Sequence, residues 1–203
     1  MLGTFPAPKR QVTSAVMDDR AMLADLRAEK PGAFEAIFRS YYAPLVAVAE
    51  QLLGTRSTAE DVAQEVLLEL WRRRDAIVLD TSLRAYLLRA ARNRALNQLR
   101  HDRVSRRADP EYMRGHSVPA ADGALREAEL ERAIRDAVRS LPDRAREAFE
   151  LSRVQGLSYA EIAEVLGVSI KTVEAHMGKA LRILRERLAP WLPGGAEGQS
   201  RGT

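Results

Sequence analysis

Two asparagines, Asn93 and Asn97, stand one helical turn apart in a stretch of the chain that is rich in arginine. An amide side chain donates and accepts hydrogen bonds at the same time, which matches the edge of a nucleic-acid base. Neighbouring arginines would contact phosphates, which position a protein without selecting a sequence. Arg89 and Arg100 share the arc of the asparagines, and His101 follows directly. The alternative is a solvated helix face, but the paired amides favour contact with bases.

A second basic surface is predicted near the C-terminus, where two short helices flank a glycine turn. Ser158 and Glu161 have capping-box spacing, which predicts a helix from Tyr159, and Gly167 would end that helix. Ser169 would cap the next helix, whose face opposite the apolar residues is basic and carries small side chains, as entry into a DNA major groove requires. An ordinary helical hairpin with a solvated face is the alternative. The predicted contact residues are Ser169, Lys171, Thr172, Ala175, His176, Lys179 and Arg182.

A third surface suits a protein partner. Ser57 and Glu60 form another capping-box pair, which predicts a helix from about Thr58 with an apolar arc and an opposite arc that is acidic but also carries Leu68. Large apolar side chains beside carboxylates are typical of interface anchors. The predicted docking residues are Asp61, Gln64, Glu65, Leu68 and Trp71. Packing of Trp71 on a neighbouring helix is an equal alternative for that residue.

The sequence gives no support to an enzyme. The chain has no cysteine, and its three histidines lack metal-ligand spacing. It also shows neither a nucleophile–base pair nor a glycine-rich phosphate loop, so we expect no catalytic residue, no metal and no cofactor. No apolar run is long enough to span a bilayer, and the first residues lack the apolar core of a signal peptide, so we expect a cytoplasmic protein.

Helices must position these residues, because the hydrophobic residues recur mainly every three or four positions. Aromatic residues make up only 5% of the chain, which leaves Leu, Ala, Val and Ile to build the core. The predicted helices span about 18–29, 33–53, 58–73, 83–103 and 124–141, with three more from Pro142 to Leu188. Pro44 should kink or divide the second of them. The predicted fold class is therefore all-α.

The apolar period is lost from about Val104 to Gly123, where Pro110, Gly115 and Pro119 interrupt the chain. A stretch of about 20 residues is too long for a simple loop inside one compact domain. We therefore predict two small helical domains joined by a flexible linker, with the helix-turn-helix in the second. The predicted segments are a disordered N-terminus (1–17), a first domain (18–103), the linker (104–123), a second domain (124–189) and a disordered tail (190–203).

Together these residues resemble bacterial sigma-70 family factors of the small extracytoplasmic-function (ECF) type. One block, similar to sigma region 2, runs from Ala33-Phe34-Glu35-Ala36-Ile37-Phe38 through Ala59-Glu60-Asp61-Val62-Ala63-Gln64-Glu65-Val66 to Leu70-Trp71. A second, Ala91-Arg92-Asn93-Arg94-Ala95-Leu96-Asn97-Gln98-Leu99-Arg100, looks like the promoter-melting helix of that region. A third, from Leu141-Pro142 through Leu184, is similar to sigma region 4.

The resemblance implies a protein that binds core RNA polymerase, recognises minus-thirty-five and minus-ten promoter elements and promotes DNA melting for transcription initiation. It implies that the docking residues around Leu68 contact the β′ clamp helices, that Asn93 and Asn97 capture unstacked bases of the minus-ten element, and that the basic face after Ser169 binds the minus-thirty-five element as duplex. It further implies contact with the β flap and allows an anti-sigma factor as a partner. Glu174, Ala175 and Gly178 stand where bulkier or basic side chains are common in the family, so the resemblance does not imply a promoter sequence.

Two other classes of protein compete with this interpretation. A helix-turn-helix regulator of the LuxR type, acting without replacing a sigma subunit, is the main alternative, because residues 156–188 resemble its DNA-binding part nearly as well. Such a regulator needs a sensor domain, normally α/β, and the first half of the chain shows no buried-strand pattern. A helical adaptor without a nucleic-acid role would leave both basic faces unexplained.

Overall fold

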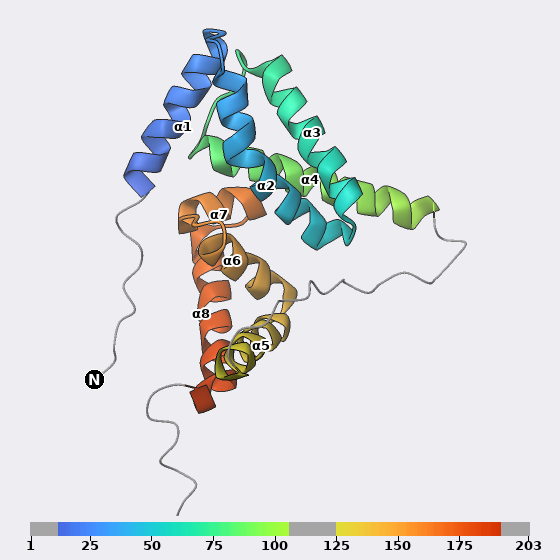
Figure 1. The fold of residues 1–203 in the computed structure, drawn as a ribbon, viewed down its shortest axis with the longest axis vertical. Helices are drawn as coiled ribbons and strands as arrows, with labels where there is room; N and C mark the ends of the chain where they lie inside the picture. The colour runs from blue at the N-terminus through green and yellow to red at the C-terminus, as the bar shows by residue number, and fades with distance from the viewer. Residues whose placement is uncertain (1–11, 106–124, 192–203) are drawn as a thin grey trace, which may run out of the picture. The chain divides into compact units, whose positions relative to one another are not determined.

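The computed structural model describes residues 12–105 and 125–191 of the chain. Within these ranges it is built from helices and contains no strand, so the predicted all-α fold class is confirmed (Figure 1). The helices are α1 (Val12–Arg27), α2 (Ala33–Leu53), α3 (Arg56–Arg73), α4 (Leu83–Ser105), α5 (Leu125–Arg139), α6 (Asp143–Arg153), α7 (Tyr159–Leu166), α8 (Ile170–Arg187) and the short 3-10 helix η1 (Ala189–Trp191). They fall into two compact units, α1–α4 with α7, and α5, α6 and α8 with η1.

The first unit is organised around α2, which packs against α1, α3 and α4. Its core is aliphatic, as the low aromatic content predicts. Leu26 of α1, Leu45 of α2, Leu70 of α3 and Leu87 of α4 are almost completely buried, and each such burial stabilises the fold by roughly 2 kcal/mol. Because α3 and α4 each turn one side into this core, their other sides remain available for partners.

The helix α2 runs without interruption through Pro44, so of the two predicted effects of this proline, a kink or a division of the helix, division does not occur. A proline inside a helix lacks the N–H that would bond the carbonyl of Ser40 and costs about 3 kcal/mol. The buried side chains of Tyr41 and Leu45 flank the proline and hold both halves of α2 in the same core. Gly54 ends the helix as predicted, in the left-handed conformation at φ 74°.

Two helices begin earlier than predicted. The N-cap of α3 is Thr55, without a side-chain cap bond, so the capping box predicted at Ser57 is wrong. Glu60 pairs instead with Arg56, one helical turn away, at 2.9 Å from carboxylate to guanidinium. The helix α1 starts at Val12, so residues 12–17, predicted to be disordered, are helical. Three segments lie outside the described residues: residues 1–11, the part of the predicted linker that follows α4, and the part of the predicted tail that follows η1.

The start of α4 is fixed by side chains that satisfy its first backbone N–H groups. Ser82 Oγ accepts the N–H of Ala85 at 3.1 Å. One carboxylate oxygen of the buried Asp19 accepts the N–H of Arg84 at 3.1 Å, and the other accepts the hydroxyl of Tyr41. Helix N-termini leave such groups unpaired unless a side chain caps them. These bonds therefore anchor the helix that carries the predicted base-contacting amides.

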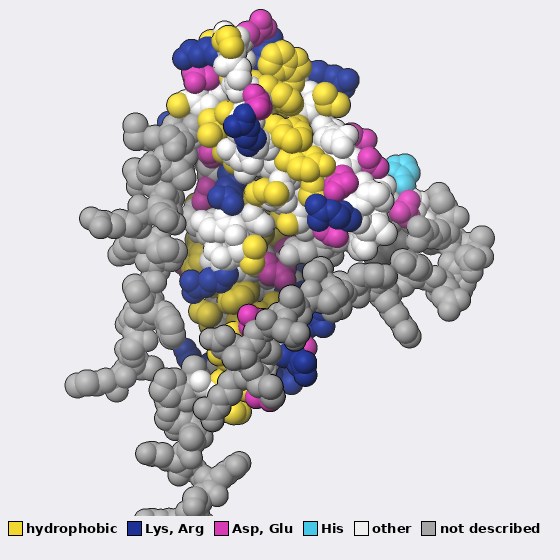
Figure 2. Space-filling model, in the orientation of Figure 1, with side chains coloured by type: hydrophobic (Ala, Val, Ile, Leu, Met, Phe, Trp, Pro, Cys, Tyr) yellow, Lys and Arg dark blue, Asp and Glu magenta, His cyan; other side chains and the backbone are white. Residues whose placement is uncertain are grey.

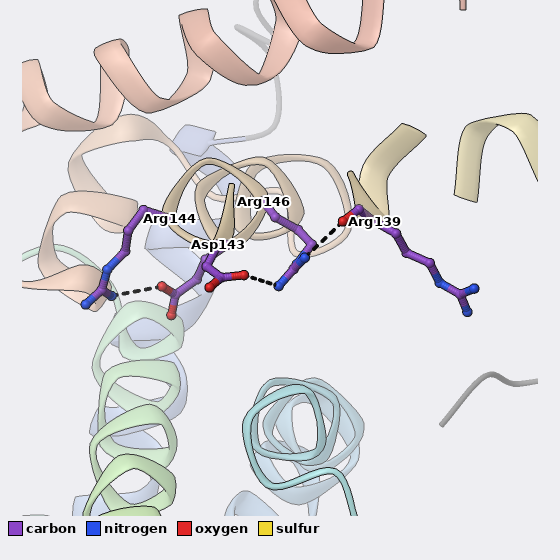
Figure 3. A network of polar contacts seen from close by, with 5 residues as sticks. Arg139, Asp143, Arg144 and Arg146 are labelled. Carbon is purple, nitrogen blue, oxygen red and sulfur yellow. Dashed lines mark hydrogen bonds and ion pairs between the residues drawn. The ribbon is translucent and has the colours of Figure 1, made fainter. Parts of the chain in front are cut away.

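In the second unit α8 packs against α5 and α6. The core cluster consists of Ala137, Leu141, Ala145, Ala180 and Leu184, with Val138, Phe149, Ile183 and Leu188 packed around it. Arg146 of α6 donates to the carbonyl of Arg139 at 3.2 Å and to the carboxylate of Asp143 at 2.6 Å (Figure 3). Arg139 is the last residue of α5, so this bond satisfies one of the free carbonyls at that helix end.

Several apolar residues that follow the helical period in this part of the chain are exposed. Leu130 and Ile134 lie on α5 ahead of the core cluster, and their side chains remain accessible to solvent, as does Leu181 of α8. Val154 is 70% exposed, because it follows the last residue of α6 and no longer belongs to the buried side of that helix. Helical spacing identifies an apolar face, but it does not show how far neighbouring helices cover that face.

In the helix-turn-helix segment, the observed helix starts agree with the sequence-based prediction. The helix α7 begins at Tyr159, as predicted, and Gly167 follows its last residue with φ 66°. Ser169 Oγ accepts the N–H of Thr172 at 3.1 Å, which confirms the predicted cap of α8. Local polar bonds thus define where the predicted DNA-contacting helix begins.

Candidate nucleic-acid and partner interfaces

The exposed side of α4 carries both amides. Ala91 and Ala95 lie in the core, whereas Asn93 and Asn97 are exposed one turn apart. The other predicted residues of this surface, Arg89, Arg100 and His101, are exposed as well. The structure therefore exposes the whole predicted set to solvent on one helix.

Two details of α4 were not visible in the sequence. Arg92 belongs to the arginine-rich stretch but is 6% exposed, because it falls on the side of the helix that faces the core. Arg100 donates a hydrogen bond from Nη1 to Oδ1 of Asn97 at 2.8 Å. One of the two amides is therefore held by a neighbouring cation.

The exposed side of α3 is acidic at its beginning and apolar toward its end. Its exposed predicted residues are Asp61, Gln64, Glu65 and Leu68, the last 50% exposed. Trp71 packs edge-to-face against Phe34 of α2, with ring centroids 5.7 Å apart, and the guanidinium carbon of Arg74 lies 4.5 Å from its ring centre. Trp71 nevertheless remains 38% exposed, so it both packs on a neighbouring helix and contributes to the surface.

An aromatic surface on α2 was missed by sequence reasoning. Phe38 follows the apolar period of α2, which assigns it to the core, yet its side chain is 38% exposed. Its ring stacks on Tyr42, with centroids 4.7 Å apart and planes 16° from parallel. Phe34 precedes Phe38 by one turn and contacts Trp71, and hydrophobic side chains gather on one face over α2 and α3 (Figure 2). We call Phe34, Phe38, Tyr42 and Trp71 the aromatic ridge. The sequence signal that could have indicated this surface is the spacing of Phe34, Phe38 and Tyr42 by one helical turn, in a chain with few aromatic residues.

The helix α8 has a buried side and a basic front. Val173, Met177, Ala180 and Leu184 are buried. The exposed residues of the predicted set are Ser169, Lys171, Ala175, Lys179 and Arg182, while Thr172 and His176 are half-buried. A Cβ added at Gly178 would meet nothing within 4 Å, so this position on the front is open. The small residues leave the helix backbone accessible between the cations, as close approach to a groove requires.

Two other kinds of feature are absent from the described residues, a metal-ligand cluster and a membrane-spanning helix. No group of His, Asp and Glu side chains in residues 12–105 and 125–191 is arranged to hold a metal ion. In the same part of the chain, no helix combines the length and the apolar character needed to cross a membrane.

Comparison with known proteins decides between the families considered. Residues 37–104 match the family model of sigma-70 region 2, and residues 131–184 match that of sigma-70 region 4. The chain belongs to the sigma-70 family. The match to region 2, together with the absence of strands from the described residues, shows that the LuxR-type alternative is wrong.

The relatives place this sigma factor in the ECF type. It is 26% identical over 174 residues to the ECF RNA polymerase sigma factor SigK of Mycobacterium tuberculosis, covering 83% of this chain and 92% of that protein. It is 27% identical over 166 residues to the ECF sigma factor SigW of Bacillus subtilis, covering 77% and 89%. As an ECF sigma factor it directs RNA polymerase to promoters for transcription initiation and is not an enzyme.

Two solved structures share the fold. CnrH, solved with the cytosolic domain of CnrY, aligns with a TM-score of 0.57 and 25% identity over 84% of this sigma factor and 96% of that chain. RpoE of Bartonella quintana, solved with the anti-sigma factor NepR, aligns with a TM-score of 0.62 and 26% identity over 78% and 98%.

Proposed function

We propose that three exposed helix faces of this sigma factor divide the work of initiation. The acidic face of α3 and the aromatic ridge bind the β′ clamp helices of core polymerase, the amides of α4 capture minus-ten bases, and the front of α8 binds the minus-thirty-five element. The observation that carries the proposal is the joint exposure of Asn93 and Asn97 among arginines on a helix whose other side is core. An exposed amide pair serves base recognition better than it serves solubility.

The role of α4 follows from what an unpaired base offers. A base presents its Watson–Crick edge only after it leaves its partner strand, and amide side chains can hydrogen-bond to that edge. A surface that binds the single strand more tightly than the duplex shifts the equilibrium toward melting. Arg89 and Arg100 supply cations for the adjacent phosphates.

The α3 surface predicts the chemistry of its partner. Asp61 and Glu65 suit basic side chains of the partner. Leu68 and Trp71 lie further along the helix and suit apolar side chains. From residue 61 to residue 71 the helix advances about 15 Å, which matches a partner helix of about three turns. Large apolar anchors dominate the energetics of such interfaces, whereas rim charges mainly steer association.

The front of α8 combines charge with close approach. Lys171, Lys179 and Arg182 are exposed cations, each able to contact one phosphate. Ala175 and the open position at Gly178 let the helix lie deep in a major groove. This surface therefore holds duplex DNA, in contrast to the single strand held by α4.

The second unit has exposed apolar residues that fit another polymerase contact. Leu130 and Ile134 are one turn apart on α5 and are 37% and 42% exposed. We assign them to the β flap. The similar sigma factor RpoE was solved with the anti-sigma factor NepR, which supports an anti-sigma partner for this chain too. Such an inhibitor would compete with core polymerase for the apolar surfaces named above.

The test is transcription reconstituted from purified core polymerase and this sigma factor, on a promoter selected from a library. Asn97→Ala should reduce open-complex formation and weaken binding of the holoenzyme to a single-stranded non-template oligonucleotide that covers the minus-ten region, whereas initial binding to the duplex promoter should change much less. Gln51→Ala removes an exposed amide from α2 and serves as the matched control with unchanged activity. A loss of duplex binding as large as the loss of single-strand binding would assign Asn97 to general DNA contact instead of base capture, and transcription without core polymerase would overturn the whole proposal.

A further inference from the structure

We propose that Arg100 orients the Asn97 amide so that this position of α4 selects bases with a carbonyl group at C4 or C6, namely thymine and guanine. The inference rests on the proposed role of Asn97 in base capture and adds which bases Asn97 prefers. Its starting point is the 2.8 Å hydrogen bond from Arg100 Nη1 to Asn97 Oδ1. Both residues are exposed and lie three positions apart on one helix, so they face the same incoming strand.

Chemistry fixes the orientation of the amide. A guanidinium group carries only donors, so the group of Asn97 that meets Arg100 must be the carbonyl oxygen. The NH₂ group of the same amide then points away from Arg100. Turning the amide over would bring two donors together and lose a charge-assisted hydrogen bond. Asn97 therefore presents itself to a ligand mainly as a donor.

A donor placed at the exocyclic group on C4 or C6 distinguishes two classes of base. Thymine and guanine carry a carbonyl oxygen, O4 or O6, at the position where cytosine and adenine carry an amino group. The outward NH₂ of Asn97 can donate to the carbonyl without disturbing Arg100. An amino group instead needs the amide oxygen, one lone pair of which is already committed to Arg100. At the base that contacts Asn97, thymine and guanine are favoured over adenine and cytosine.

Asn93 provides an internal comparison on the same helix. The residue three positions after Asn93 is Leu96, which has no donor, whereas the residue three positions after Asn97 is Arg100. The base that Asn93 contacts is therefore not subject to the same constraint. Substitution of Arg100 should change base preference at one promoter position and leave the other as it was.

The experiment measures base preference with the complete holoenzyme. Core polymerase carrying this sigma factor binds single-stranded non-template oligonucleotides randomised across the minus-ten region, and bound and free pools are sequenced. The position that loses its preference with Asn97→Ala is the one that Asn97 contacts. At that position Arg100→Met should reduce the ratio of carbonyl to amino bases by about twofold to fivefold, as loss of one exposed charged hydrogen bond implies. Asn97→Asp, which only accepts, should reverse the preference toward adenine and cytosine.

Two further variants separate orientation from charge. Arg100→Lys keeps a donor and should keep the base preference. Arg89→Met also removes an exposed arginine from α4, so it should weaken binding to all sequences while leaving the ratio unchanged. An unchanged ratio with Arg100→Met, at a position where Asn97→Ala does act, would overturn this inference and leave the proposed function standing. No effect of Asn97→Ala at any position would instead overturn the proposed function itself.

Discussion

Glu65 of α3 and Arg94 of α4 form an ion pair, with 3.5 Å between the Glu65 Oε2 and Arg94 Nε atoms. The pair connects the helix proposed to bind polymerase with the helix proposed to bind the single strand. The Glu65 side chain is 68% exposed, and ion pairs in such surroundings contribute about 0–1 kcal/mol to stability. Under the proposed function, a basic group of the polymerase would displace Arg94 from Glu65 at little cost, and Arg94 would become available to a phosphate.

Glu65→Gln should separate binding from stability. Because the ion pair is exposed, we expect Tm to fall by less than about 4 °C, while affinity for core polymerase decreases measurably. Thermal unfolding and fluorescence titration with core polymerase check the two effects. The double variant Glu65→Arg with Arg94→Glu restores an ion pair of reversed polarity, and full recovery of core affinity in it would show that Glu65 acts through Arg94 instead of through the polymerase.

The apolar part of the docking surface should carry more of the binding energy. Leu68→Asp should weaken core association by about thirtyfold or more, as expected for an interface anchor. Phe38→Ala should weaken it by about tenfold, since truncation removes one ring of the stacked pair with Tyr42. Val154→Asp, at an exposed apolar residue outside this surface, is the control. Normal association of both docking variants would remove α3 and the aromatic ridge from the interface.

The sequence predicted those features that depend on neighbours along the chain. The Ser169 cap, the end of α2 at Gly54 and the exposed placement of Asn93 and Asn97 follow from local bonds and helical period. The same local rule failed at Ser57, where an ion pair between Arg56 and Glu60 one turn apart accompanies an earlier start of α3. A capping box and an ion pair are both compatible with the residue spacing there, and the spacing alone does not show which of them forms.

Features that depend on distant neighbours escaped prediction. Phe38, Leu130 and Ile134 obey the helical period, and only the packed structure shows that no neighbouring helix covers them fully. The ion pair between Glu65 and Arg94 joins residues that the sequence separates by the end of α3, a loop and the first half of α4. At the candidate site, the sequence therefore predicted which residues lie on each helix face. It did not predict how far each exposed face extends or the hydrogen bond from Arg100 to Asn97.

Glu150 offers a test of stability against pH. Burial raises the pKa of its carboxyl group above the ordinary value; Arg146 opposes the shift and Glu147 adds to it. A carboxyl whose pKa is raised by folding destabilises the fold when ionised, and stability recovers as pH falls through the raised pKa. Glu150→Gln should therefore raise Tm at pH 7. The gain should shrink on acidification and vanish below the ordinary glutamate pKa of about 4.3, and a gain that grows at low pH would contradict the assignment.

Gly178→Ala should have opposite effects on stability and on DNA binding. Nothing lies within 4 Å of the added Cβ, so the methyl group fits without strain. Alanine is favoured over glycine inside a helix by about 0.5–1 kcal/mol, which should raise the free energy of unfolding of the second unit. The methyl group lies on the front of α8, so binding of duplex minus-thirty-five DNA should weaken. Denaturant unfolding and duplex titration check this, and unchanged duplex affinity would argue against close approach at Gly178.

Lys179→Gln tests whether the front of α8 contacts phosphates. Each phosphate contact releases counterions, so the logarithm of the binding constant falls with the logarithm of salt concentration by about 0.9 per contact. Losing the exposed Lys179 cation should reduce that slope by about one for duplex binding by the holoenzyme. Arg187→Gln removes a cation from α8 outside the basic front and should leave the slope unchanged. Because both variants lose one charge, a difference between them reports contact with DNA, whereas equal slopes would place Lys179 away from the phosphates.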